Sequence, residues 1–129
     1  MGVEAWEMAE IRSYMDLLVW QKGIELVEEV YRTIAAFPPD ERYALGAQIR
    51  RSAVSVPSNI AEGQARQHTA EFRQFLYVSL GSLAELDTQL IIANKLAYIT
   101  NESHKIIKDR LIELQKMLSS LIKKLITSH

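Results

Sequence analysis

The sequence predicts an all-α protein, an antiparallel up-and-down four-helix bundle. Apolar residues recur at alternating steps of three and four in separate segments of the chain, which is the period of amphipathic helices. No segment shows the strict alternation or the Asn-Gly and Asp-Gly turns that strands and hairpins favour. Short connections between long helices imply antiparallel neighbours. The 129 residues suit one domain, with a short N-terminal extension at residues 1–13 and the bundle at residues 14–129.

The first predicted helix follows Asp16, a plausible N-cap. It ends before Pro38 and Pro39, which helix interiors do not accommodate. Its predicted core positions are Leu17, Trp20, Ile24, Val27, Tyr31 and Ile34. The extension before it carries Trp6, Met8 and Ile11, which fit either a short amphipathic helix or a partly ordered tail.

The second predicted helix contains a proline. Its apolar positions keep their spacing on both sides of Pro57, at Gly46, Ile49, Ala53, Val56, Ile60 and Gly63. A loop would not preserve this phase, so the segment is predicted to be one helix with a kink at Pro57. The ring removes an amide donor and frees the carbonyl of Ala53, at a cost of about 3 kcal/mol. Ser55 or Ser58 is expected to satisfy the backbone nearby.

The third and fourth helices have the most regular spacing. Thr69 is the expected cap of the third helix, with a stripe at Phe72, Leu76, Ser79, Leu83, Leu86, Leu90, Ala93 and Ala97. The segment Thr100 to Ser103 provides a turn and a cap for the fourth. The stripe of that helix is Ile107, Leu111, Leu114, Leu118, Leu121 and Leu125.

Several helices carry more apolar residues than a single core stripe requires. These are Leu18, Leu26, Val30, Phe75, Tyr77, Ile91, Ile92, Ile106, Ile112, Ile122 and Ile126. Flanking positions widen the core stripe of ordinary globular helices, which explains about half of them. The others indicate a second buried face, so we expect self-association.

The composition excludes several classes of function. There is no cysteine, so neither disulfides nor thiolate chemistry is expected. None of His68, His104 and His129 follows a glutamate by three residues, as a di-iron bundle requires. There is no glycine-rich phosphate loop, no basic-then-apolar leader and no apolar run that approaches a membrane span. We therefore expect a cytoplasmic protein that is not an enzyme, with no metal, cofactor, small-molecule substrate or membrane partner.

Charge is unevenly distributed although the net charge is −1. Residues 1–41 have a net charge of −6, whereas residues 42–73 and 104–129 have +3 and +4. The basic segments fit either solvated helix faces, the preferred interpretation, or a surface for a phosphate backbone.

The polar side of the second helix carries the candidate interaction residues. Arg51, Ser55, Ser58 and Glu62 share one helical face, flanked by Arg50 and Asn59. Glu85 lies beside the stripe of the third helix, and a carboxylate there needs a partner, which Arg50 or Arg51 would supply. Two interpretations remain: a salt bridge that fixes helices or subunits, which is preferred, or a site for an anion or RNA phosphate. The candidate residues are Arg50, Arg51, Ser55, Asn59, Glu62 and Glu85.

Four segments of the chain resemble the four-helix-bundle proteins encoded in intervening sequences of bacterial 23S ribosomal RNA genes. They are "LLVWQKGIELVEEVY", "FPPDERYALGAQIRRSAVSVPSNIAEG", "EFRQFLYVSLGSLAELDTQL" and "KMLSSLIKKL". The resemblance extends from about Tyr14 to Leu125. The matching motif residues are Arg50, Arg51, Pro57, Asn59, Glu62, Gly63, Gly81, Ser82 and Glu85.

This resemblance implies a four-helix bundle that assembles as a ring-like homopentamer. Relatives called accessory variability proteins, from diversity-generating retroelements, form similar pentamers and bind a reverse transcriptase and nucleic acid. Those relatives are strongly basic, and this chain, with a net charge of −1 and an acidic first helix, departs from them. Two functions are therefore expected: a homo-oligomeric scaffold for a protein or RNA partner or, as the alternative, an RNA-binding protein associated with 23S rRNA intervening sequences.

Overall fold

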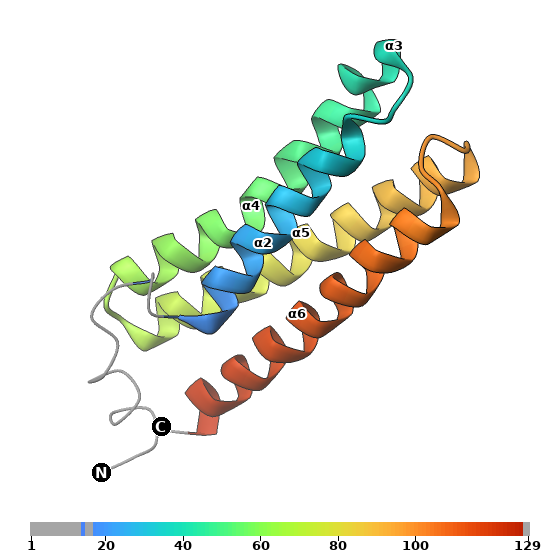
Figure 1. Cartoon of the computed structure of the whole chain (residues 1–129). Helices are drawn as coiled ribbons and strands as arrows, with labels where there is room; N and C mark the ends of the chain where they lie inside the picture. Colours follow the sequence, from blue (N-terminus) through green and yellow to red (C-terminus); the bar gives the residue numbers. More distant parts are fainter. Residues whose placement is uncertain (1–13, 15–16, 128–129) are drawn as a thin grey trace.

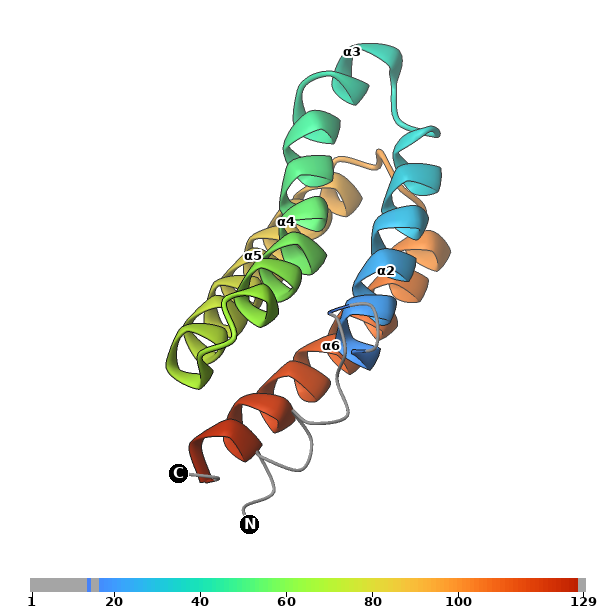
Figure 2. The same cartoon turned by 90° about the vertical axis from the view of Figure 1, so that its left-hand side faces the viewer.

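Four long helices lie side by side and are connected in sequence order (Figures 1 and 2). The computed structural model describes residue 14 and residues 17–127. The long helices are α2 (Leu18–Ile34), α4 (Leu45–Ala65), α5 (Thr69–Lys95) and α6 (Asn101–Thr127), and a single turn, α3 (Pro39–Arg42), precedes α4. Each long helix packs against the next, and α2 also packs against α6, which closes the bundle. The described residues contain no strand, so the predicted all-α bundle is confirmed.

Helix α4 runs without interruption through Pro57, and its axis bends along its length (Figure 2). Two side chains bond carbonyls beside the proline: Asn59 Nδ2 donates to the carbonyl of Ser55 at 2.8 Å, and Ser79 Oγ on α5 donates to that of Val56 at 2.9 Å. The prediction of one kinked helix is confirmed. The expectation that Ser55 or Ser58 satisfies the backbone is wrong, because Ser55 Oγ bonds Ser82 and Ser58 is exposed.

The predicted core stripes of α4 and α5 are confirmed almost completely. All six predicted positions of α4 are buried, as are the seven of α5 from Phe72 to Ala93. Ala97 is the exception, because α5 ends at Lys95 and Ala97 lies in the following turn, exposed and with a φ of 62°. The predicted cap Thr69 is the first residue of α5 and follows the N-cap position, which His68 occupies.

The predicted stripe of α2 is only partly confirmed: Leu17 and Ile34 are buried, and Trp20 and Val27 pack against the core, but the centre of the helix is rotated from the prediction. The buried residues are Val19, Gly23, Leu26, Val30 and Ile34. Ile24 and Tyr31, which were predicted for the core, are exposed. Gly23 accounts for the rotation: a Cβ placed on it would lie 3.3 Å from the Cβ of Pro57, so α2 packs closely on α4 at a residue that hydrophobicity patterns ignore.

The remaining ends of the bundle follow the sequence with small shifts. Thr100 accepts a hydrogen bond of 3.1 Å from the amide of Ser103, which confirms the predicted cap of α6. Near the C-terminus Ile122 is buried and Leu121 only partly so, because 3.6 residues per turn drift from a strict seven-residue repeat. The predictions for Trp6, Met8, Ile11 and Asp16 lie outside the described residues.

Candidate interaction site on helices α4 and α5

Three of the predicted site residues meet where α4 and α5 pack together, a region referred to below as the α4–α5 seam. Ser52 Oγ donates to Oε1 of Glu85 at 2.7 Å. One turn farther along, the hydroxyls of Ser55 and Ser82 are 2.8 Å apart, and Asn59 Nδ2 lies 2.9 Å from Ser55 Oγ. These bonds link positions that are 33 and 27 residues apart in sequence. Glu85 therefore belongs to one polar bridge between the helices, and Ser55 and Asn59 belong to a second bridge one turn away.

The two arginines of the motif have different environments. Arg50 Nη2 donates to the carbonyl of Arg42 at 2.9 Å, and its guanidinium lies 5.8 Å from the centre of the Tyr31 ring. These contacts hold the turn between α3 and α4 against α2, so Arg50 has a structural role. Arg51 is exposed and makes no hydrogen bond or ion pair with any described residue. Neither arginine pairs with Glu85 within the described part of the chain, where Ser52 takes that place.

Arg51 and Glu85 line the same small hollow on the outside of the seam. Its volume is about 250 Å³, and its lining is completed by Gln48, Ser52 and Gln89. Oε1 of Gln89 is buried and has no hydrogen-bond partner. A buried acceptor without a donor is costly, and Glu85 Oε2 also bonds no described residue. Among the described residues, the hollow thus contains the unpaired cation of Arg51, the unpaired Oε2 of Glu85 and the buried, unpaired Oε1 of Gln89.

Glu62 lies apart from this hollow. Its carboxylate pairs with Arg66 one turn later, at 3.3 Å, and both side chains are about half exposed. Arg66 also lies 3.8 Å from Glu71 and 5.4 Å from the centre of the Phe75 ring. Exposed pairs of this kind contribute at most about 1 kcal/mol. The contacts of Glu62 therefore involve the turn between α4 and α5 and not the hollow.

Sequence reasoning missed Ser52 and Gln89. Ser52 is 3% exposed, directly before Ala53 of the core stripe. Its position at the edge of the apolar stripe is the only local signal that it faces α5. Gln89 lies one turn after Glu85, on the same side of α5, and a four-residue step from the candidate glutamate would have pointed to it.

The site has no obvious chemistry of its own. No group of three or more His, Cys, Asp or Glu side chains in the described residues is placed to hold a metal ion. The serines of the seam bond each other, a carboxylate or a backbone carbonyl, and none has a histidine partner. What the site can do chemically is form ion pairs and hydrogen bonds with another molecule.

The outer face of α5 continues this surface with apolar residues. Tyr77, Val78, Ile92 and Leu96 are between 43% and 53% exposed. Between them lies Gly81, and a Cβ added there would meet nothing within 4 Å. Gly81 therefore does not serve close packing against any described residue of this chain. The middle of α5 is apolar along much of its length, although less than a third of it is buried.

By length and composition, α5 is the one helix among the described residues that is long and apolar enough to cross a membrane. The same measure is met by core helices of soluble bundles, and the α5 stripe forms the centre of this core.

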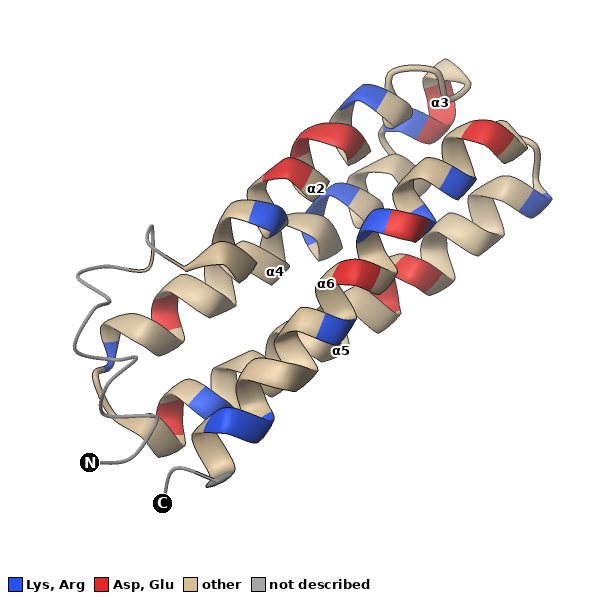
Figure 3. Cartoon of the chain, turned by 60° about the horizontal axis from the view of Figure 1, so that its bottom comes forward, with Lys and Arg blue, Asp and Glu red and all other residues tan. Residues whose placement is uncertain are grey.

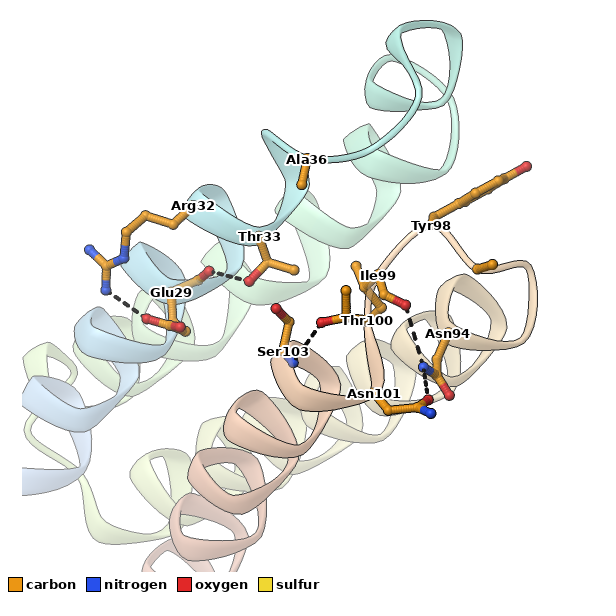
Figure 4. A pocket seen from close by; sticks show the side chains of 11 residues that line it. Glu29, Arg32, Thr33, Ala36, Asn94, Tyr98, Ile99, Thr100, Asn101 and Ser103 are labelled. Carbon is orange, nitrogen blue, oxygen red and sulfur yellow. Dashed lines mark hydrogen bonds and ion pairs between the residues drawn. The ribbon is translucent and has the colours of Figure 1, made fainter.

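A second, larger hollow lies at the other side of the bundle, between the end of α2 and the turn from α5 to α6 (Figure 4). Its volume is about 670 Å³. Arg32 pairs with Glu29 at 2.8 Å, and this hydrogen bond raises the pKa of Arg32. Asn94 bonds Asn101 across the turn at 2.9 Å. The polar groups here largely bond one another, and no motif residue lines the hollow.

Comparison with known proteins agrees with the motif. A sequence profile described as 23S rRNA-intervening sequence protein matches residues 15–120. A crystal structure of a protein of unknown function from the S23 ribosomal protein family of Bacteroides thetaiotaomicron is similar, with a TM-score of 0.76 and 27% identity. The similarity covers 82% of this chain and 99% of that one. No curated protein matches. With more than half of its length matched by the profile, the chain belongs to the 23S rRNA-intervening sequence protein family.

Proposed function

We propose that this protein is a non-enzymatic scaffold that self-associates through the outer face of α5. The observation that carries the proposal is the exposure of Tyr77 and Val78 beside the open space at Gly81, and of Ile92 and Leu96 at the C-terminal end of the helix. Exposed apolar residues that gather on one side of a protein commonly mark an interaction site. A ring of five copies is the arrangement that the family resemblance implies.

Gly81 adds an argument from helix energetics. Glycine inside a helix costs about 1 kcal/mol relative to alanine. Within this chain nothing occupies the space where its side chain would be, so intramolecular packing does not require it. Close approach of another backbone is a common use of such a glycine. A second copy seated over Gly81 would explain both the glycine and the apolar residues around it.

The mass of the protein in solution tests this proposal. We expect light scattering at micromolar concentration to give a multiple of the 14.7 kDa chain mass, five-fold for the implied ring. Gly81→Arg should reduce the mass to that of one chain while the far-UV circular dichroism stays helical, because the space is open and arginine favours helices. A wild-type mass of one chain overturns the proposal.

The alternative function is RNA binding, and a groove between α5 and α6 favours it. The groove is lined by Leu80, Gln115, Lys116, Ser119, Ser120 and Lys123. In Figure 3, Lys and Arg positions of α5 and α6 lie near the C-terminal end of α6. Lysines beside hydroxyls suit phosphate oxygens. The acidic residues of α2, also visible in Figure 3, would repel phosphates and therefore argue against a nucleic-acid surface that extends over the whole bundle.

A salt series distinguishes the two functions. Binding to 23S rRNA fragments should weaken steeply with salt if phosphate contacts supply the affinity. Lys116→Glu should then reduce the affinity at low salt, because it removes a cation from the groove. Absence of binding at low salt removes the RNA function for the isolated protein and leaves the scaffold proposal intact.

A further inference from the structure

We infer that Arg51 of one copy forms an ion pair with Glu85 of a neighbouring copy, with α4 of the first lying against α5 of the second. This inference rests on the proposed self-association and assigns its polar contact. The molecule that covers the hollow at the α4–α5 seam is thus a second copy of this chain.

Glu85 is prepared for such a pair. Ser52 is buried in the seam, and its Oγ donates to Oε1 of Glu85 at 2.7 Å, which orders the carboxylate. Oε2 of Glu85 bonds no described residue. A side chain that is already ordered loses less conformational entropy when it binds. Guanidinium groups favour carboxylates that accept two parallel bonds.

Arg51 supplies the complementary group. An exposed guanidinium is hydrated, so the absence of an internal partner carries no weight alone. The position of Arg51 is the stronger argument. Arg51 lines the same hollow as Glu85 and Gln89, whose Oε1 is unpaired, and yet Arg51 and Glu85 form no ion pair within the described chain. Arg50, its neighbour, is already held by Arg42 and Tyr31. Of the two motif arginines, only Arg51 is available.

Shape agrees with charge in one register. Within the chain α4 and α5 are antiparallel, with Ser52 opposite Glu85 and Ser55 opposite Ser82. If α4 of one copy meets α5 of the next in a similar antiparallel register, Arg51 opposite Glu85 places Val54, about 4.5 Å farther along its helix, opposite Ser82. Val54 is 40% exposed, and the space over Gly81, the residue next to Ser82, is empty. An exposed apolar side chain then lies beside an open space.

This contact joins two different surfaces, so it repeats from copy to copy. A head-to-tail contact produces a closed ring when its rotation closes and a filament when it does not. The same pairing therefore fits a ring with any number of copies, and the test below does not depend on that number.

Charge exchange tests the pair. Arg51→Glu and Glu85→Arg are each expected to raise the dissociation constant at least about tenfold, measured by sedimentation over a concentration series. The double variant should return it to within about threefold of wild type, because the charges are exchanged but still opposite. Arg110→Glu is the matched control, since Arg110 is an exposed α6 arginine without a described partner, and it should leave association unchanged. Circular dichroism verifies folding. If Glu85→Arg unfolds, Glu85→Gln, which keeps an acceptor for Ser52, replaces it, and the pair is then expected to appear as a less than additive effect of Arg51→Glu and Glu85→Gln.

The outcomes separate the two claims. A wild-type oligomer that neither single variant weakens overturns the Arg51–Glu85 pair and leaves the scaffold proposal standing. Single variants that both weaken association without rescue in the double variant also overturn the pair, because the residues then act independently. A monomeric wild type overturns the scaffold proposal itself.

Discussion

Ser52 on α4 donates a hydrogen bond of 2.7 Å to Oε1 of Glu85 on α5, and this bond joins the two parts of the sequence motif. It lies next to a second bridge between the helices, from Ser55 to Ser82. The side chains of the motif therefore first hold α4 to α5. Only Arg51 and the outer oxygen of Glu85 remain for another molecule. The inner side of the motif makes contacts within the described chain, and its outer side carries the interaction that we propose between copies.

Ser52→Ala should lower the free energy of unfolding by about 1 kcal/mol, the usual net contribution of one such hydrogen bond. The exposed Glu85 carboxylate regains water, which limits the loss. Urea unfolding at one fixed protein concentration measures it, because association makes stability depend on concentration. Ser58→Ala, at an exposed position of the same helix, is the control. Equal stability of the two variants would contradict the prediction.

Ser79→Ala should cost about 1–2 kcal/mol. The Ser79 hydroxyl is fully buried and bonds the carbonyl of Val56 beside the proline at 2.9 Å. Thermal or urea unfolding checks the loss. Thr88→Ala on the same helix removes a similar bond, to the carbonyl of Ala84 on the exposed face, and should change stability by less than about 0.5 kcal/mol. A larger loss for Thr88→Ala would show that the buried bond is not the important one.

Glycine to alanine should have opposite effects at two positions. At Gly63 a Cβ would lie 2.6 Å from the Cβ of Phe75, so Gly63→Ala should destabilise the fold by about 1–3 kcal/mol despite better helix propensity. At Gly81 the space is open, and Gly81→Ala should stabilise the isolated chain by up to about 1 kcal/mol. Denaturation of both variants in parallel compares the signs. A stabilising effect at Gly63 would mean that α4 and α5 are farther apart than described here.

Lys108 and Asp87 should show the largest coupling of the charge pairs between helices. Both carboxylate oxygens accept from Lys108 Nζ, at 2.6 and 2.8 Å, and the side chains are only 34% and 23% exposed. A double-mutant cycle with alanine should give a coupling near 1 kcal/mol, decreasing in high salt. The exposed pair of Lys105 and Asp109 should give less than half of that. Similar couplings for the two pairs would show that burial does not strengthen the first.

The sequence by itself determined the number and type of the helices and the inward faces of α4 and α5. Their stripes at steps of three and four are long, and all but the last predicted position, Ala97, are buried. The persistence of that spacing through Pro57 also identified α4 as a single helix. These features are local, because the helical period and the burial of one face follow from residues within a few turns of each other.

Tertiary structure alone decided the rotation of α2 and the partners of the polar motif. On α2 two adjacent stripes have nearly the same apolar spacing, and the contact of Gly23 with Pro57 selects between them. The partner of Glu85 is Ser52, from another helix, whereas sequence reasoning favoured an arginine. Helical period gives the direction of a side chain within its own helix, but the facing residue depends on how far each helix turns and slides until its smallest residues come into contact.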